Sequence, residues 1–180
     1  DEGAGHRVLL RALASDGDGI ARTTSGRVVF VEGAVPGDRV ELTGLREQRG
    51  TLRARIARLV EASGDRVAPP CPHFGICGGC AWQHVRYAAQ LEAKRKNVRA
   101  ALERIGGLRL EADVEIVASP DEYHYRARTR VVEVEGGVGY RRRASNEALR
   151  VEECPGLLPA VQTALAEQGR RVAGSQAREW

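Results

Sequence analysis

Four cysteines, Cys71, Cys77, Cys80 and Cys154, are the residues whose type and spacing most directly indicate chemistry. The first three fall within a ten-residue segment. Its Gly78 and Gly79 allow the backbone to turn tightly enough for both flanking thiols to face one centre. Four cysteines in 180 residues are too few for a disulfide scaffold. The spacing therefore predicts a reduced metal site with the remote Cys154 as its fourth ligand.

The spacing alone leaves the metal open between zinc and an iron–sulfur cluster. Zinc ribbons usually use two Cys-x2-Cys pairs, whereas this chain has one such pair, one cysteine upstream and one far downstream. A remote cysteine followed by proline, as in Cys154-Pro155, is typical of cluster-binding sequences. His73 and His84 are possible alternative zinc ligands, although such histidines are more often loop residues without a metal role.

Arginines are most frequent between Arg126 and Arg150, a stretch that contains seven arginines and three glutamates. Guanidinium groups grip phosphate oxygens in pairs and stack on bases, and tyrosines beside them offer further stacking surfaces. This composition predicts RNA binding; the alternative is a charged hairpin whose arginines pair with Glu133, Glu135 and Glu147. The predicted RNA contacts are Arg126, Arg128 and Arg130 on an extended strand, then Tyr140, Arg141, Arg142 and Arg143 across a hairpin.

Two further predicted RNA contacts, Arg53 and Arg55, alternate with Leu52, Ala54 and Ile56 and would share one face of a strand. An ordinary solvated outer face is the competing interpretation of this pattern.

Composition narrows the class of protein further. A net charge of +4 and an isoelectric point near 9.1 favour nucleic acid as the partner. No apolar run reaches the roughly 18 residues of a membrane span, and Walker, dinucleotide-binding and metalloprotease motifs are absent from the sequence. We expect a monomeric cytoplasmic protein with RNA as its partner and no membrane. Because the chain lacks methionine, we also expect it to be a piece of a longer protein.

The pattern of elements predicts an α+β fold. Five short antiparallel strands at 7–12, 19–23, 27–32, 39–45 and 51–60 would form a small oligonucleotide-binding (OB-like) barrel. Beyond the linker and cysteine loop, we expect a helix at 83–105, strands at 114–118, 126–134, 138–143 and 149–151, and a final helix at 157–168. The predicted domains are residues 1–62 (barrel), 63–82 (linker and loop) and 83–180 (helix plus an incomplete central RNA-binding domain).

The chain resembles the RNA uracil-5-methyltransferases that use S-adenosylmethionine and have an N-terminal TRAM domain. The resemblance covers nearly the whole chain and implies that a four-iron, four-sulfur cluster is held by the four cysteines. It also implies a ribosomal or transfer RNA substrate. The residues that support it are Gly19-Ile20-Ala21-Arg22, Val29-Phe30-Val31, Ala34-Val35-Pro36-Gly37-Asp38, the segment Cys71 to Cys80, Trp82-Gln83-His84, Arg104-Ile105-Gly106-Gly107, Tyr125-Arg126-Ala127-Arg128, Gly139-Tyr140-Arg141-Arg142-Arg143 and Cys154-Pro155.

The chain also departs from that family. Its members continue into a methyltransferase domain with a glycine-rich cofactor loop, a nucleophilic cysteine and an acidic base, none of which is among these residues. If all four cysteines bind metal, none remains as a nucleophile, so we expect that this chain alone does not catalyse and that only the full-length enzyme binds S-adenosylmethionine. Ala127 stands where the family often has asparagine. Alternatives are a stand-alone RNA-binding module and, less favoured, an electron-transfer protein.

Overall fold

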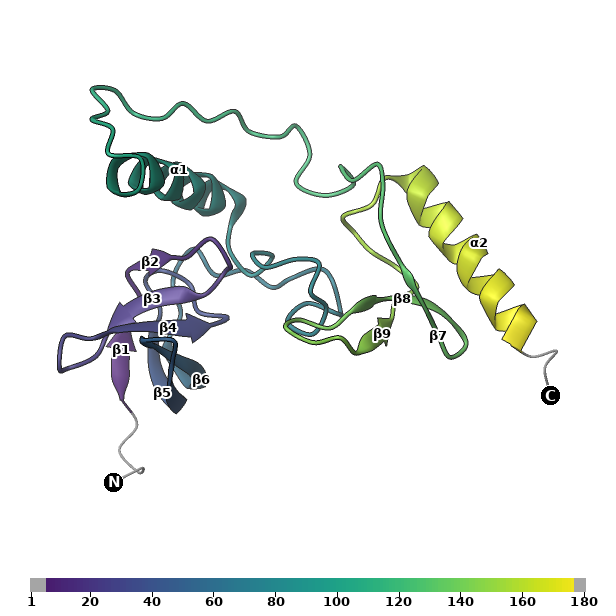
Figure 1. The fold of residues 1–180 in the computed structure, drawn as a ribbon, viewed down its shortest axis with the longest axis horizontal. Helices are drawn as coiled ribbons and strands as arrows, with labels where there is room; N and C mark the ends of the chain where they lie inside the picture. Colours follow the sequence, from purple (N-terminus) through teal and green to yellow (C-terminus); the bar gives the residue numbers. More distant parts are fainter. Residues whose placement is uncertain (1–5, 177–180) are drawn as a thin grey trace. The chain divides into compact units, whose positions relative to one another are not determined.

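A computed structural model of the chain describes residues 6–176. The chain forms two compact units, and each is built from two separate stretches of sequence. The first unit comprises the residues up to Ala68 and His84–Ala118, and the second comprises Pro69–Gln83 and the residues from Ser119 onward. Figure 1 follows this path by colour, from the purple and blue strands to the yellow C-terminal helix. None of the described helices is long and apolar enough to cross a membrane.

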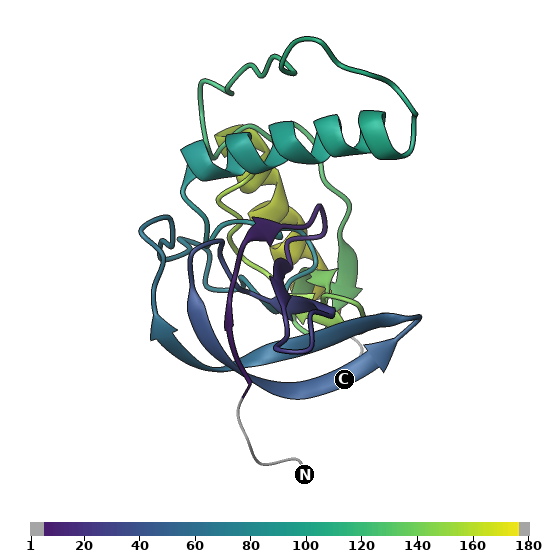
Figure 2. The same cartoon turned by 90° about the vertical axis from the view of Figure 1, so that its left-hand side faces the viewer.

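A six-stranded sheet forms the body of the first unit, with β5 and β6 as its long curved strands (Figure 2). Neighbouring strands are antiparallel except for β4 and β6, which run parallel. The strand order is β1 (Arg7–Leu9), β5 (Arg39–Gln48), β6 (Thr51–Glu61), β4 (Val28–Glu32), β3 (Gly19–Arg22) and β2 (Ala12–Leu13).

This sheet corrects two details of the sequence prediction. The stretch expected as one strand at 7–12 divides into β1, which pairs with β5, and β2, which pairs with β3. The expected all-antiparallel arrangement is also wrong, because β5 separates β4 from β6 in sequence and lies on the other side of β6 in the sheet. The ladder is open between β1 and β2, so the closed OB-like barrel stays a prediction.

The core of the first unit follows the two-residue period of its strands. Val29 and Val31 on β4, Val40 on β5 and Ala54 on β6 are buried, while intervening residues face outward. Packing is close at Gly19, where an added Cβ would lie 2.8 Å from the Cβ of Ala34. The backbone therefore approaches its neighbours at a position that only glycine allows without displacement.

Asp38 fastens the stretch that follows β6 to the sheet. Its fully buried carboxylate accepts hydrogen bonds from the backbone N–H of Val35 at 2.7 Å and of Ser63 at 2.9 Å. The Arg66 guanidinium donates to the same carboxylate at 2.5 Å and also to the Gly33 carbonyl. Burial acts to raise the pKa of Asp38, but these hydrogen bonds outweigh it and lower the pKa.

Helix α1 (Tyr87–Arg104) belongs to the first unit. It begins later than the predicted residue 83 because the residues just before it are used in pairing: Val67 donates its N–H to the His84 carbonyl, and Arg66 bridges to Val85. None of its residues is fully buried, and Val98 of the expected apolar stripe is 48% exposed. The predicted domain 83–180 includes this helix, whereas in the structure the helix belongs to the same compact unit as the six-stranded sheet.

The second unit contains a smaller sheet and a helix. The strands β7 (Val132–Val134), β8 (Gly137–Arg141) and β9 (Ala148–Arg150) pair antiparallel in that order, and α2 (Pro159–Gln176) packs on β8. The core consists of Val138 on β8 with Leu157, Leu165 and Val172. The sheet-rich α+β class and both helices are confirmed, although α2 runs beyond the predicted 157–168.

One expected strand does not form, and another forms only at its C-terminal end, as β7. Residues 114–118 are irregular, and Asp113 just before them is held against α1 by Arg95 and Arg99 at 2.5 and 2.6 Å. Residues 126–131 join no ladder except at Arg126, which forms an isolated parallel bridge to Leu157. The prediction that one strand presents Arg126, Arg128 and Arg130 on a single face is therefore wrong as secondary structure.

Candidate metal centre and nucleic-acid interface

The cysteine loop is folded by its own backbone. The carbonyl of His73 accepts hydrogen bonds from the N–H groups of Ile76 and Cys77, at 3.1 and 2.8 Å, and the Cys71 carbonyl accepts from Phe74. Gly75 takes a φ of +84°, a left-handed conformation that strongly favours glycine. Successive turns therefore bring Cys71 and Cys77 to the same side of the loop.

The second half of the loop is anchored on the β8–β9 hairpin. The N–H of Gly78 donates to the Arg141 carbonyl at 3.0 Å, and the N–H of Arg143 donates to the Ile76 carbonyl at 2.8 Å. Cys77 and Arg142 form an antiparallel bridge between these two bonds. The loop thus extends the edge of the small sheet, with main-chain groups of Arg141, Arg142 and Arg143 as its partners.

Cys154 reaches the same place from the other direction. It follows β9, and its N–H donates to the side-chain carbonyl of Gln162 on α2 at 2.9 Å. Its own carbonyl accepts from Leu157, a fully buried residue of the second core. The position of the remote cysteine is therefore set by the helix and the core.

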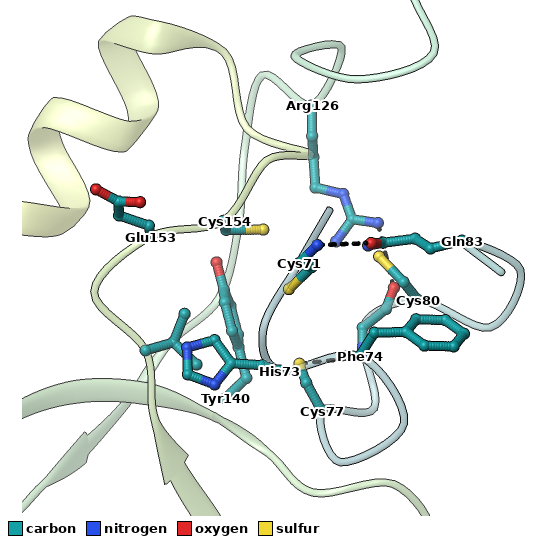
Figure 3. Close-up of a pocket in the computed structure, with 12 residues that line it drawn as sticks. Cys71, His73, Phe74, Cys77, Cys80, Gln83, Arg126, Tyr140, Glu153 and Cys154 are labelled. Carbon is teal, nitrogen blue, oxygen red and sulfur yellow. Dashed lines mark hydrogen bonds between the residues drawn. The ribbon is translucent and has the colours of Figure 1, made fainter. Parts of the chain in front are cut away.

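All four cysteines line one pocket within the second unit, which we call the cysteine pocket (Figure 3). All four are free thiols. Gln83 closes one side and accepts a hydrogen bond from the Cys71 N–H at 3.3 Å. His73 also lines the pocket, whereas His84 belongs to the first unit. Arg126 and Tyr140 also line the cysteine pocket.

The surroundings of Cys71 and Cys77 favour their neutral thiol forms in the absence of a cation. Burial raises the pKa of Cys71 and of Cys77, and the neighbouring cysteines raise both further. A bound cation reverses this balance, because thiolates are the form that ligates metals. Among residues 6–176, no three His, Cys, Asp or Glu side chains converge closely enough to hold one ion.

The donor set nevertheless fits a group larger than one ion. In a four-iron cluster each iron takes its own thiolate, so four sulfurs surround a volume instead of meeting at a point. Four free thiols around one pocket match that requirement in number and type.

A second cavity in the same unit, the arginine cavity, is lined by Arg126, Arg128, Thr129, Arg130 and Tyr140. The Thr129 hydroxyl donates to the phenolic oxygen of Tyr140 at 2.9 Å and holds that ring in place. Arg128 and Arg130 are exposed, and no carboxylate of the described chain pairs with either. The three alternating arginines therefore meet at one cavity, although they do not form the expected strand.

The hairpin arginines have contacts of their own. The Arg141 guanidinium donates to the Asn146 carbonyl, and Arg142 pairs with Glu147 at 3.6 Å. The predicted pairing with Glu147 is thus present for one arginine of the hairpin. The main chain of residues 141–143 also holds the cysteine loop, a role that the sequence pattern did not predict.

Arg53 and Arg55 lie on β6 in the first unit. Arg53 donates to the Asp18 carboxylate at 2.6 Å, approaches Asp16 at 3.4 Å, and places its guanidinium carbon 5.5 Å from the centre of the Phe30 ring. Arg55 pairs with Glu32 at 3.3 Å on the exposed side of the sheet.

Two residues that help to build the site were not predicted. Gln83 receives the Cys71 N–H, and Thr129 orders Tyr140. Gln83 could have been noticed because it lies in the Trp82-Gln83-His84 segment next to the last loop cysteine. Nothing in the sequence near Thr129 indicates its partner, because that contact depends on how residues 126–131 pass β8.

The chain is similar to proteins of known family. Residues 2–57 match the TRAM domain. The 23S rRNA (uracil(1939)-C(5))-methyltransferase RlmD of Halomonas elongata is 41% identical over 162 residues, which cover 88% of this chain and 33% of the relative. The RlmD of Aromatoleum aromaticum is 39% identical over 159 residues, with 86% and 36% covered. The chain thus spans about a third of the length of these relatives.

A solved structure is also similar. The Pyrococcus abyssi tRNA (uracil-54, C5)-methyltransferase in complex with S-adenosyl-L-homocysteine has a TM-score of 0.62 and 29% identity. The similarity covers 90% of this chain and 35% of that structure.

Proposed function

Because this chain has a TRAM domain and is related over most of its length to the RlmD-type RNA uracil-C5 methyltransferases, we propose that it is the RNA-recognition part of such an S-adenosylmethionine-dependent enzyme. Its substrate would be 23S ribosomal RNA or transfer RNA. Its task would be to hold the folded RNA while one uridine is turned out of the stack into a catalytic site. We further propose that it acts as a monomer in the cytoplasm.

The cysteine pocket supports a structural 4Fe–4S cluster held by Cys71, Cys77, Cys80 and Cys154. Bound there, the cluster would supply a crosslink of four metal–thiolate bonds. Three of these residues come from the loop and the fourth follows β9, so their ligation ties together segments that are far apart in sequence. The single observation on which this assignment depends is that four free thiols surround one pocket.

The arginine cavity supports phosphate binding, because Arg128 and Arg130 offer guanidinium groups that no carboxylate of the described residues neutralises. Tyr140 places an aromatic ring in the same cavity. We propose Arg126, Arg128, Arg130 and Tyr140 as the main contacts, Arg141, Arg142 and Arg143 as neighbouring contacts, and Arg53 and Arg55 as weaker contacts from the first unit.

Catalysis would require residues outside these 180. Addition of a thiolate to C6 makes the C5 of uracil nucleophilic, but all four cysteines of this chain line the cysteine pocket. We therefore propose that the nucleophile and the S-adenosylmethionine site belong to a separate catalytic part, and that this chain alone binds RNA without methylating it.

Metal and sulfide analysis tests the assignment directly. Protein purified without oxygen is expected to contain about four irons and four acid-labile sulfides per chain, with visible absorption from the cluster. Stoichiometric zinc without sulfide would overturn the cluster assignment. Binding of a fluorescent single-stranded RNA is tested in parallel across salt concentrations, and affinity that does not fall as salt rises would contradict phosphate recognition.

A further inference from the structure

The cysteine pocket and the arginine cavity share two of their lining residues, Arg126 and Tyr140. The two cavities therefore adjoin, and the same side chains face both. Tyr140 is held by Thr129 on the side of the arginine cavity. Arg126 is the charged residue of the pair, and its contacts could couple binding in the arginine cavity to the position of the cysteine loop.

Both the backbone and the guanidinium of Arg126 form hydrogen bonds on the side of the cysteine pocket. Its backbone N–H donates to the Gly156 carbonyl at 2.9 Å, and its carbonyl accepts from Leu158 at 3.0 Å, two and four residues after Cys154. Its guanidinium donates to the carbonyl of Gly79 at 3.4 Å, between Cys77 and Cys80. One residue thus joins the segment after Cys154 to the loop that holds the other three cysteines.

The guanidinium still has donors to spare. Arginine has five N–H groups in a rigid fork; one of them is used at Gly79, and the guanidinium also interacts with the Tyr125 side chain. The remaining N–H groups can meet a phosphate in the arginine cavity, beside Arg128 and Arg130. A phosphate gripped from that side would hold the guanidinium against the Gly79 carbonyl, because a bidentate pair fixes the plane of the group.

We propose that Arg126 is a positioning residue that links the two sites, so that RNA phosphate bound in the arginine cavity slows the opening of the cysteine loop and protects the group that the cysteines hold. The inference rests on the proposed function, since it requires both RNA binding and a loaded cysteine pocket. Loss of a cluster to a chelator requires local opening of its loop, and a ligand that holds the closed form reduces the open population.

The test measures iron release from the loaded protein to a ferrous chelator, with and without a saturating twelve-nucleotide oligouridine. RNA is expected to slow release about fivefold in the unchanged protein, the lower end of ordinary coupling between sites. With Arg126→Gln the RNA should still bind through its other contacts, but it should slow release less than about 1.5-fold, since the link is removed. Arg128→Gln is the matched control. This variant should need a higher RNA concentration for saturation, but saturating RNA should slow its iron release as much as in the unchanged protein.

Arg126→Lys covers the case in which the glutamine variant does not fold. Lysine keeps the charge, so the variant should still bind RNA. It lacks the fork that reaches both the Gly79 carbonyl and a phosphate, so bound RNA should slow iron release only weakly. Full protection with either Arg126 variant, or equal loss of protection with Arg128→Gln, would overturn the link. If the unchanged protein binds no oligouridine, the proposed function itself fails; if it binds but release is unaltered, only the link fails.

Discussion

The two units of this chain are stabilised by different means. One cluster of ten buried apolar residues fills the first unit, whereas the corresponding cluster of the second has four, too few to order its long irregular segments unaided. Small cores of this kind usually need disulfides or metals in addition. The comparison indicates that the cysteine pocket is part of the architecture of the second unit.

Particular arginines of the two units also differ in whether they have a counter-charge. On the sheet of the first unit, Arg58 and Arg7 both donate to Glu41 at 2.8 Å and lower its pKa to about 2. In the second unit, Arg128 and Arg130 face a cavity with no carboxylate partner in the described chain. Neutralised arginines support a fold, and arginines without a counter-charge are available to a polyanion.

Removing one ligand of the proposed cluster should have the largest effect, and that effect should be confined to the second unit. Cys154→Ser is expected to reduce bound iron from about four atoms per chain to about three or fewer, because one iron loses its thiolate. Hydrogen exchange should then show loss of protection in β7, β8 and β9 while β3 to β6 stay protected. Equal loss in both units, or none in either, would refute the assigned difference.

Asp38→Asn should destabilise the first unit by about 3 kcal/mol, because it leaves the Arg66 guanidinium partly buried without its counter-charge. Since the folded pKa of Asp38 lies below its ordinary 3.8, the stabilisation is present above about pH 4 and is lost as pH falls through the lowered value. Urea unfolding at pH 7 and at acid pH measures both effects.

The control for Asp38 is Glu61→Gln, which removes an exposed pair with Arg39 and should cost under about 1 kcal/mol. If the Asp38→Asn variant loses stability with falling pH as steeply as the unchanged protein does, a group other than Asp38 causes the acid destabilisation.

Gly139→Ala should destabilise the second unit by about 2 kcal/mol, because the added Cβ would lie 1.9 Å from the carbonyl oxygen of Leu149 and force β8 and β9 apart. Gly174→Ala on α2 is the same substitution with nothing within 4 Å, and it should stabilise the helix by about 0.5 kcal/mol. Thermal unfolding of both variants measures the contrast. A loss of similar size at both positions would remove steric crowding as the cause.

The smallest effect concerns RNA affinity. Arg128→Gln together with Arg130→Gln should weaken binding of single-stranded RNA about tenfold and reduce the slope of log affinity against log salt by about 1.4. Arg53→Gln should weaken binding less, since Asp16 and Asp18 already share its charge. Fluorescence anisotropy in a salt series distinguishes them, and a larger loss with Arg53→Gln would reverse the proposed order.

The sequence predicted those parts of the fold that depend on local patterns. Alternating residues such as Val29 and Val31 located the strands of the first unit, and turn glycines located most of their ends. The parallel pairing of β4 with β6 could not be predicted, because it depends on which distant edges meet. For the same reason α1 was expected to begin too early: the residues before it are used in pairing with 66 and 67.

For the candidate site, residue types were easier to predict than their surroundings. The cysteine spacing indicated one shared site, and the four thiols do line one pocket. Alternation predicted that Arg126, Arg128 and Arg130 lie on one face of a strand, whereas they line one cavity without forming a strand. That Arg126 also contacts the cysteine loop follows from its bridge to Leu157, a contact between residues 31 positions apart.

The interleaving of the two units sets an order of events during synthesis. Cys154 is synthesised 74 residues after Cys80 (154 − 80). At about 5 to 20 residues per second, the three thiols of the cysteine loop exist for roughly 4 to 15 s before Cys154 is added. Meanwhile the ribosome produces His84–Ala118, which completes the first unit. The first unit can therefore be folded while the three thiols of the cysteine loop are still open to oxidation.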